Sequence, residues 1–85
     1  MLRYTVLIYE DREERTFGVV VPELPGCVTQ GESLDAALAN AKEAIEGHLL
    51  TLVESGEEIP EETGTPMMAT VEVAPDFSSI GVARR

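Results

Sequence analysis

Apolar and polar residues alternate in the first part of the chain in a way that is typical of β-strands. Residues 3–10 would place apolar side chains on both faces of such a strand, because successive side chains of a strand point in opposite directions. The two faces are Tyr4, Val6 and Ile8, and Thr5, Leu7 and Tyr9. Since both faces are largely apolar, we expect this strand to lie in the centre of its sheet.

Two more strands are predicted in the next part of the chain. Residues 16–21 are rich in β-branched side chains, which favour strands, and the polar residues 11–15 before them predict a solvated hairpin loop. Pro22 ends the second strand because proline lacks the N–H that a sheet requires. After a turn at Pro25-Gly26, residues 27–30 are long enough for a short third strand.

A long amphipathic helix is predicted from about residue 34 to about residue 54, where apolar side chains recur at spacings of three and four. The apolar stripe consists of Leu34, Ala37, Leu38, Ala41, Ala44, Ile45, His48, Leu49 and Leu52. Ser33 is a suitable N-cap because its hydroxyl can accept a hydrogen bond from an amide of the first turn. Gly56 can adopt the left-handed conformation that often ends a helix.

One further strand is predicted after the helix. Residues 57–66 form an acidic loop with two prolines, and residues 67–73 then alternate again, with Ala69, Val71 and Val73 opposite Met68, Thr70 and Glu72. Residues 78–82 are a candidate for a short additional segment, and the final two arginines are expected to fray. The order β-β-β-α-β indicates an α+β fold, in which a three-stranded antiparallel meander and a further strand carry one long helix on one face.

The charge of the chain restricts its partners. The 85 residues include 16 acidic and 6 basic side chains, which gives a formal net charge of −10 at pH 7. Nucleic acids and anionic lipids bind through lysine and arginine, so we expect neither to be a direct partner. The acidic surplus favours a basic protein partner, or serves solubility alone. Because the core is small, we also expect self-association, as a dimer or a tetramer.

Signals for export or membrane insertion are not evident. Residues 4–9 are too short for the apolar part of a signal peptide, and no apolar run approaches the roughly 20 residues that a membrane helix needs. Cys27 is the only cysteine, which excludes an internal disulfide. These observations predict a soluble cytoplasmic protein.

The most specific motif combines a proline-rich turn, a glycine and a capped helix. Residues 22–35, with the sequence PELPGCVTQGESLD, closely resemble the signature of the HicB-like antitoxin family, of the UPF0150 type. Ala37, Ala41, Ala44 and Ile45 continue this pattern into the helix, and Ile59-Pro60 is similar to the usual segment after it. The resemblance covers about residues 3–73, which is most of the chain.

This resemblance implies a partial RNase-H-like fold and the antitoxin half of a type II toxin–antitoxin system. The partner that it implies is a small, basic, mRNA-cleaving toxin of the HicA type. An acidic protein is electrostatically suited to cover a basic RNA-cleaving surface. Only about a dozen residues follow the last predicted strand, so residues 1–85 are expected to form a single domain without a separate DNA-binding domain.

Two kinds of interface are predicted, one for each of two functions. For a toxin, the candidate partner-binding residues are Asp11, Glu13, Glu14 and Glu23, whereas the dense acidic residues after the helix are interpreted mainly as a solvated loop. The alternative is a solitary HicB-like protein that self-associates in a structural or regulatory role without a toxin. Its subunits would meet through an open sheet edge or through His48, Leu49 and Leu52.

An enzyme is the third hypothesis, and the sequence gives it little support. His48 lies on the apolar helical stripe without a second histidine at metal-ligand spacing, and Cys27 does not begin a helix, where a thiolate would be stabilised. Glu10, Asp11 and Glu72 are the carboxylates that a metal-dependent nuclease would require to converge. We therefore expect no enzymatic activity, no catalytic residue, no metal site and no cofactor.

Overall fold

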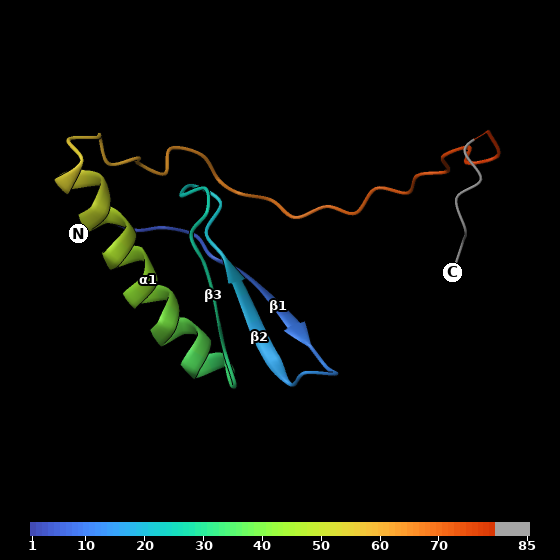
Figure 1. Ribbon diagram of the computed structural model, residues 1–85, viewed down its shortest axis with the longest axis horizontal. Coiled ribbons are helices and arrows are strands. Elements are labelled where there is room, and N and C mark those ends of the chain that lie inside the picture. Colours follow the sequence, from blue (N-terminus) through green and yellow to red (C-terminus); the bar gives the residue numbers. More distant parts are fainter. Residues whose placement is uncertain (80–85) are drawn as a thin grey trace.

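The computed structural model describes residues 1–79, in which a three-stranded antiparallel sheet is followed by one long helix (Figure 1). The elements are β1 (Leu7–Asp11), β2 (Thr16–Val20), β3 (Val28–Gly31) and α1 (Leu34–Glu54). The strands lie in the spatial order β1-β2-β3, as in a meander. The predicted α+β class, the meander and the long helix on one face of the sheet are therefore confirmed.

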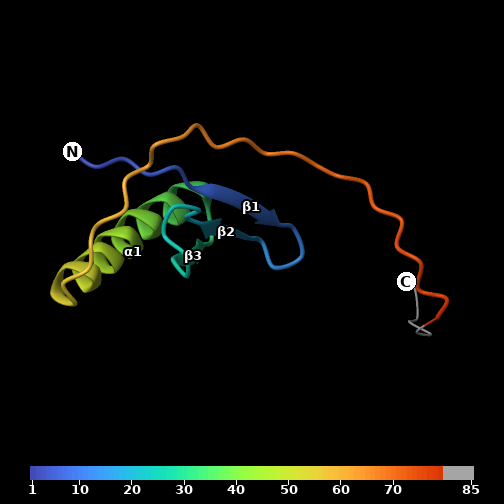
Figure 2. The ribbon, with the colours of Figure 1, turned by 90° about the horizontal axis from the view of Figure 1, so that it is seen from above.

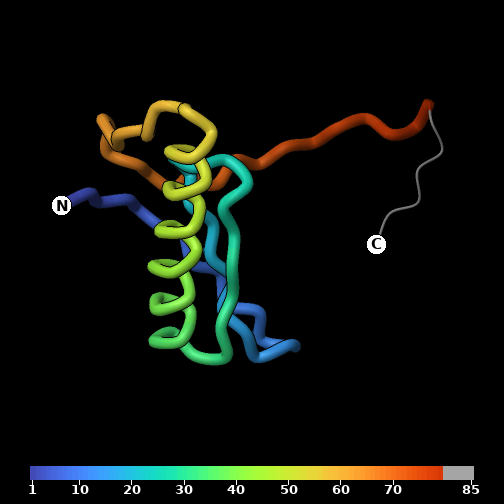
Figure 3. Tube along the Cα trace, turned by 60° about the vertical axis from the view of Figure 1, so that its left-hand side comes forward, coloured from blue at the N-terminus to red at the C-terminus, as the bar shows by residue number. Residues whose placement is uncertain are grey.

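The core lies between α1 and the face of the sheet that α1 covers. One cluster joins the buried Val19 of β2 to the buried Ala37 and Ala41 of α1. A second cluster consists of Val21, Leu24 and Cys27, which surround the loop between β2 and β3. Figure 3 shows α1 running alongside β3, and α1 packs most closely over β3 and β2, whereas β1 reaches the same core through Ile8. On the face that it covers, the helix therefore lies closer to the β3 edge of the sheet than to the β1 edge.

Gly31 allows α1 to lie close to β3. A Cβ atom placed on Gly31 would lie 2.4 Å from the backbone nitrogen of Ala37 and 2.7 Å from its Cα. Any side chain at this position would therefore collide with the first turns of the helix. The end of β3 and the start of α1 are packed backbone against backbone, and both Gly31 and Ala37 are buried.

Both ends of α1 are capped as predicted. The Ser33 hydroxyl oxygen accepts a hydrogen bond from the Ala36 N–H at 3.0 Å. At the other end, Gly56 adopts a left-handed φ of 73°. The Gly56 N–H donates to the Val53 carbonyl at 3.0 Å, and the Glu57 N–H donates to the Leu52 carbonyl at 2.9 Å. This pair of bonds satisfies carbonyl groups that the helix itself leaves without partners.

The first strand differs from the prediction in its position and its start. β1 lies at the edge of the sheet in this chain, not in its centre. It also begins at Leu7. In the same register, Thr5 would pair with Pro22, but Pro22 has no N–H to offer, and the Thr5 N–H donates to the Glu62 carboxylate instead.

The last predicted strand is extended but unpaired. Residues 67–73 form no ladder with β1, β2 or β3, and they are exposed as they run away from the sheet (Figures 1 and 2). The chain leaves the body through Gly64 and Pro66, and neither residue favours continued pairing, since proline lacks a donor and glycine has no side chain to pack. The short segment considered at residues 78–82 and the final arginines extend beyond the described residues.

Candidate functional site

The face of the sheet that points away from α1 is exposed and partly apolar. We call it the outer face and define it by Leu7, Tyr9, Asp11, Thr16, Gly18, Val20, Val28 and Gln30, which alternate with the core residues. Leu7 pairs with Val20, and Val20 pairs with Val28, so these three side chains form one apolar row across all three strands. Tyr9, Val20 and Val28 are exposed, and Leu7 is half-buried.

A shallow depression of about 510 Å³ lies on the outer face next to the hairpin loop. Tyr9, Gly18 and Gln30 occupy neighbouring positions on the three strands, and the lack of a side chain at Gly18 leaves the space between the other two open. Glu10, Asp11, Arg12 and Glu13 are also part of its wall. Aromatic, amide, carboxylate and guanidinium groups therefore surround a cleft that is open to solvent.

Three of the four predicted partner-binding acids lie together in the hairpin loop. Asp11 orders this loop, because its Oδ1 accepts hydrogen bonds from the N–H groups of Glu13 and Glu14, both at 3.0 Å. The side chains of Glu13 and Glu14 remain exposed at the tip. The structure thus gives Asp11 a local structural role and leaves Glu13 and Glu14 accessible.

The fourth predicted acid, Glu23, lies at the other end of the sheet, in the loop between β2 and β3. Its carboxylate belongs with those of Glu61 and Glu62 around the Tyr4 hydroxyl. Burial, together with these three negative charges, raises the pKa of Tyr4 above its usual value. The four predicted acids therefore lie in two places, one at each end of the strands, and do not make a single patch.

Glu62 joins the segment after α1 to the segment before β1. Its two carboxylate oxygens accept hydrogen bonds from the N–H and the hydroxyl of Thr5, each at 2.6 Å. These two bonds lower the pKa of Glu62. The Tyr4 hydroxyl donates to the Pro60 carbonyl next to this contact. Residues 60–62 are thus held beside residues 4 and 5.

The residues predicted for a subunit interface lie on the part of α1 that faces the loop between β2 and β3. His48 and Leu52 line a groove of about 280 Å³ together with Cys27. Leu49 is half-buried and packs against the Val21, Leu24 and Cys27 cluster of its own chain. Burial raises the pKa of the Cys27 thiol, which disfavours the reactive thiolate.

The carboxylates considered for a nuclease are not brought together. Glu10 and Asp11 lie at the end of β1, whereas Glu72 lies in the exposed segment that leaves the body. Within residues 1–79, there is no group of three or more His, Cys, Asp or Glu side chains that could hold a metal ion. In the same part of the chain, no helix is long and apolar enough to cross a membrane.

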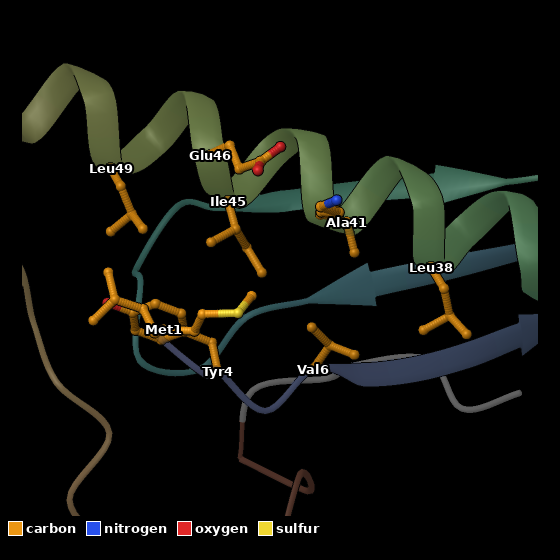
Figure 4. Close-up of a pocket in the computed structure, with 10 residues that line it drawn as sticks. Met1, Tyr4, Val6, Leu38, Ala41, Ile45, Glu46 and Leu49 are labelled. Carbon is orange, nitrogen blue, oxygen red and sulfur yellow. The ribbon is translucent and has the colours of Figure 1, made fainter.

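A groove of about 460 Å³ lies between α1 and the segment that leads into β1. Figure 4 shows that Leu38, Ala41, Ile45 and Leu49 of α1 point toward Met1, Tyr4 and Val6 across this space. Its lining is mostly apolar, with Lys42 and Glu46 at the rim. It adjoins β1 because α1 packs closely over β3 and β2 and lies farther from β1.

Comparison with known proteins identifies the family of this sheet and helix. A model of the HicB-like antitoxins of bacterial toxin–antitoxin systems matches residues 4–83. The chain belongs to the HicB-like antitoxin family. A UPF0150 protein of Thermoplasma acidophilum is 46% identical over 59 residues, which are 69% of this chain and 84% of the relative. A UPF0150 protein of Thermotoga maritima is 39% identical over 56 residues, which are 66% of this chain and 71% of that protein.

Solved structures support the same assignment. The N-terminal domain of the Burkholderia pseudomallei antitoxin HicB superposes with a TM-score of 0.62 at 38% identity, covering 71% of this chain and 69% of that domain. The Burkholderia pseudomallei antitoxin HicB itself superposes with a TM-score of 0.67 at 37% identity, covering 76% of this chain. This chain spans 48% of that second structure, so the likeness concerns the HicB-like fold and not the remainder of that antitoxin.

Sequence reasoning did not identify the outer face of this HicB-like domain as a candidate surface. The signal was present in the second apolar face of β1, at Leu7 and Tyr9, but it was interpreted only as a sign that the strand is central in its sheet. Periodicity shows that a face is apolar, and only the arrangement of the elements shows whether a neighbour covers it.

Proposed function

We propose that this chain is an antitoxin that binds a small basic ribonuclease toxin of the HicA type and covers the RNA-binding surface of that toxin, with no enzymatic activity of its own. The outer face carries this proposal. Its apolar row of Leu7, Val20 and Val28 offers area to bury, and the hairpin loop, in which Asp11, Glu13 and Glu14 outnumber Arg12 and Arg15, lies at the opposite end of the outer face. Interfaces of this kind combine an apolar centre with a polar rim.

Charge supports a basic partner. The net charge of −10 attracts a cationic protein over several ångströms and accelerates its association. Glu13 and Glu14 are exposed beside the outer face, where they can meet lysine or arginine side chains that would otherwise bind RNA phosphates. The antitoxin would then inhibit by occupying the surface that the RNA needs.

A capture experiment followed by an inhibition assay tests this function. Tagged chain is incubated with lysate of its native source at low salt, and the small basic protein that it retains is purified and assayed for RNA cleavage. We expect a stoichiometric amount of the chain to suppress cleavage and added salt to weaken the complex, since exposed charges are screened. RNA cleavage that continues at full occupancy of the complex would contradict the proposal.

A matched pair of charge variants tests whether the acidic residues of the hairpin loop contribute to toxin binding. Glu13→Lys with Glu14→Lys changes the hairpin loop, and Glu57→Lys with Glu58→Lys makes the same change of charge in the exposed loop after α1. We expect the hairpin variant to raise the dissociation constant for the toxin at least about tenfold, and the control to raise it much less. Equal losses would assign the effect to net charge and not to this surface.

A second pair tests the apolar row. Val28 and Leu50 are exposed to similar extents, 63% and 60%, but only Val28 lies on the outer face. We expect Val28→Ser to weaken toxin binding by about tenfold and Leu50→Ser to leave it unchanged. Binding that is insensitive to Val28→Ser would place the toxin elsewhere on the molecule.

A further inference from the structure

The segment of residues 67–73 has the alternating pattern of a strand but pairs with no strand of residues 1–79. Its odd-numbered side chains are all apolar and form one face, which consists of Met67, Ala69, Val71 and Val73. Met67 is 90% exposed, and Val71 and Val73 are exposed as well. A contiguous apolar strand in water is unfavourable and prone to pair with another chain. We call residues 67–73 the tail strand.

The tail strand extends far from the body of the protein. Figures 1 and 2 show it running beyond the end of β1. The radius of gyration is 17.1 Å and the longest extent is 50 Å, whereas a compact chain of this length has a radius of gyration of about 12 Å. The apolar face of this segment is therefore presented to the surroundings of the molecule.

The unpaired edge of β1 is a place where a further strand can bind. β1 lies at one edge of the sheet, and no strand of residues 1–79 pairs with its other side. An edge of this kind presents free N–H and C=O groups that can pair with a further strand. The groove between α1 and the segment leading into β1 adjoins this edge, and its lining includes Val6, Leu38 and Ile45. A strand added at this edge could turn alternate apolar side chains into the groove.

The geometry of the chain disfavours pairing of the tail strand with its own β1. The bonds from Thr5 to Glu62 hold residue 62 beside residue 5. Two parallel strands rise equally, by about 3.3 Å per residue. If residues 62–68 ran parallel to residues 5–11 from this contact onward, Gly64 would lie beside Leu7 and Met68 beside Asp11. The stretch facing β1 would then contain a glycine and Pro66, and most of the tail strand would pass the end of β1.

We propose that the tail strand pairs with the open edge of β1 in a second copy of this chain, with Met67, Ala69, Val71 and Val73 facing the groove beside α1 of that copy. If each copy places its tail strand on the β1 edge of the other, the two copies form a dimer with two-fold symmetry. The same contact then occurs twice, and both β1 edges are paired. Each β1 then has a neighbouring strand on both of its sides. The contact uses neither the outer face nor its acids, so it does not depend on toxin binding.

Light scattering over a range of protein concentrations, with two tail variants, gives the first test. We expect the unmodified chain to have twice the mass of one chain. Val71→Asp places a charge on the apolar face of the tail strand, and Thr70→Asp places the same charge on the opposite face. Neither residue is buried in the single chain, so both variants should keep the far-ultraviolet circular dichroism of the unmodified protein. We expect Val71→Asp to raise the dissociation constant of the dimer at least tenfold and Thr70→Asp to change it less than threefold.

Isotope-filtered NMR of the unmodified protein identifies the occupant of the groove directly. In a sample that mixes labelled with unlabelled chains, we expect contacts between the methyl groups of Val71 or Val73 in one chain and those of Val6 or Ile45 in another. Contacts confined to single chains would show that the tail folds back on its own β1 and would overturn the proposal. A chain that is monomeric at all concentrations, or a dimer that Val71→Asp does not weaken, would overturn it as well.

Discussion

The two faces of the sheet are made from similar residues but have different surroundings. On β2, Val19 is 1% exposed and the adjacent Val20 is 38% exposed. Val19 packs against Ala37 and Ala41 of α1, whereas Val20 lies in the apolar row of the outer face with Leu7 and Val28. The difference comes from α1, which covers only one face. Side-chain type therefore does not distinguish a residue that stabilises this fold from a residue that is available to a partner.

Packing on the covered face requires α1 to lie very close to the sheet, whereas the outer face has no such requirement. Gly31 and Ala37 bring the backbones of β3 and α1 together, and the small side chain of Ala41 continues this contact along the helix. On the outer face, Tyr9, Val20 and Val28 are not covered by α1 and remain exposed. Changes to the covered face should therefore alter stability, and changes to the outer face should alter binding.

Truncation of Leu24 should have the largest effect on stability. Leu24 is fully buried in the loop between β2 and β3, against Val21 and Cys27. We expect Leu24→Ala to lower the free energy of unfolding by about 3 kcal/mol, because it removes apolar contacts and leaves a cavity. Urea unfolding followed by circular dichroism measures this change.

Val28→Ala provides the control from the outer face. Val28 is exposed, so its truncation should change the free energy of unfolding by no more than about 0.5 kcal/mol. If both substitutions destabilised the protein equally, Val28 would have to be buried in solution, and the contrast between the two faces would fail.

A methyl group at Gly31 should have the next largest effect. Because the added Cβ would lie 2.4 Å from the Ala37 nitrogen, α1 must move away from β3. We expect Gly31→Ala to lower the free energy of unfolding by about 2 kcal/mol. In contrast, a Cβ atom at Gly47 would meet nothing within 4 Å, so Gly47→Ala should stabilise the helix by up to about 1 kcal/mol. Thermal melts of the two variants should move in opposite directions, and a loss in both would contradict this account of Gly31.

The local elements could be predicted from the sequence because their causes are local. The Ser33 cap, the left-handed Gly56 and the alternation in β2 each depend on residues a few positions apart, and each prediction is confirmed. The family could also be recognised, because residues 22–35 combine the turn, the glycine and the helix start in one continuous motif. The close approach at Gly31 is different, since it depends on where α1 lies in space.

The predictions that concern neighbours across long sequence distances were less successful. β1 was expected in the centre of the sheet and lies at its edge, and residues 67–73 were expected to pair and do not pair within residues 1–79. Both differences have one physical origin: an apolar pattern shows that a segment is suited to burial, but not which element lies beside it.

The smallest predicted effect on stability concerns Glu62, whose contact lies outside both apolar clusters. Its carboxylate accepts two hydrogen bonds from Thr5, which lower its pKa below the usual value of 4.5. A carboxyl group with a lowered pKa in the folded state stabilises the protein above its unfolded pKa, and this contribution is lost as the pH falls through the folded pKa. Glu62→Gln should therefore be less stable than the unmodified protein at pH 7, and the difference should shrink at pH 3.

Glu61→Gln removes the same charge from an exposed neighbour and serves as the control in urea titrations at both pH values. An equal effect of the two substitutions at pH 7 would assign the change to net charge, and the contact between Thr5 and Glu62 would then contribute nothing measurable.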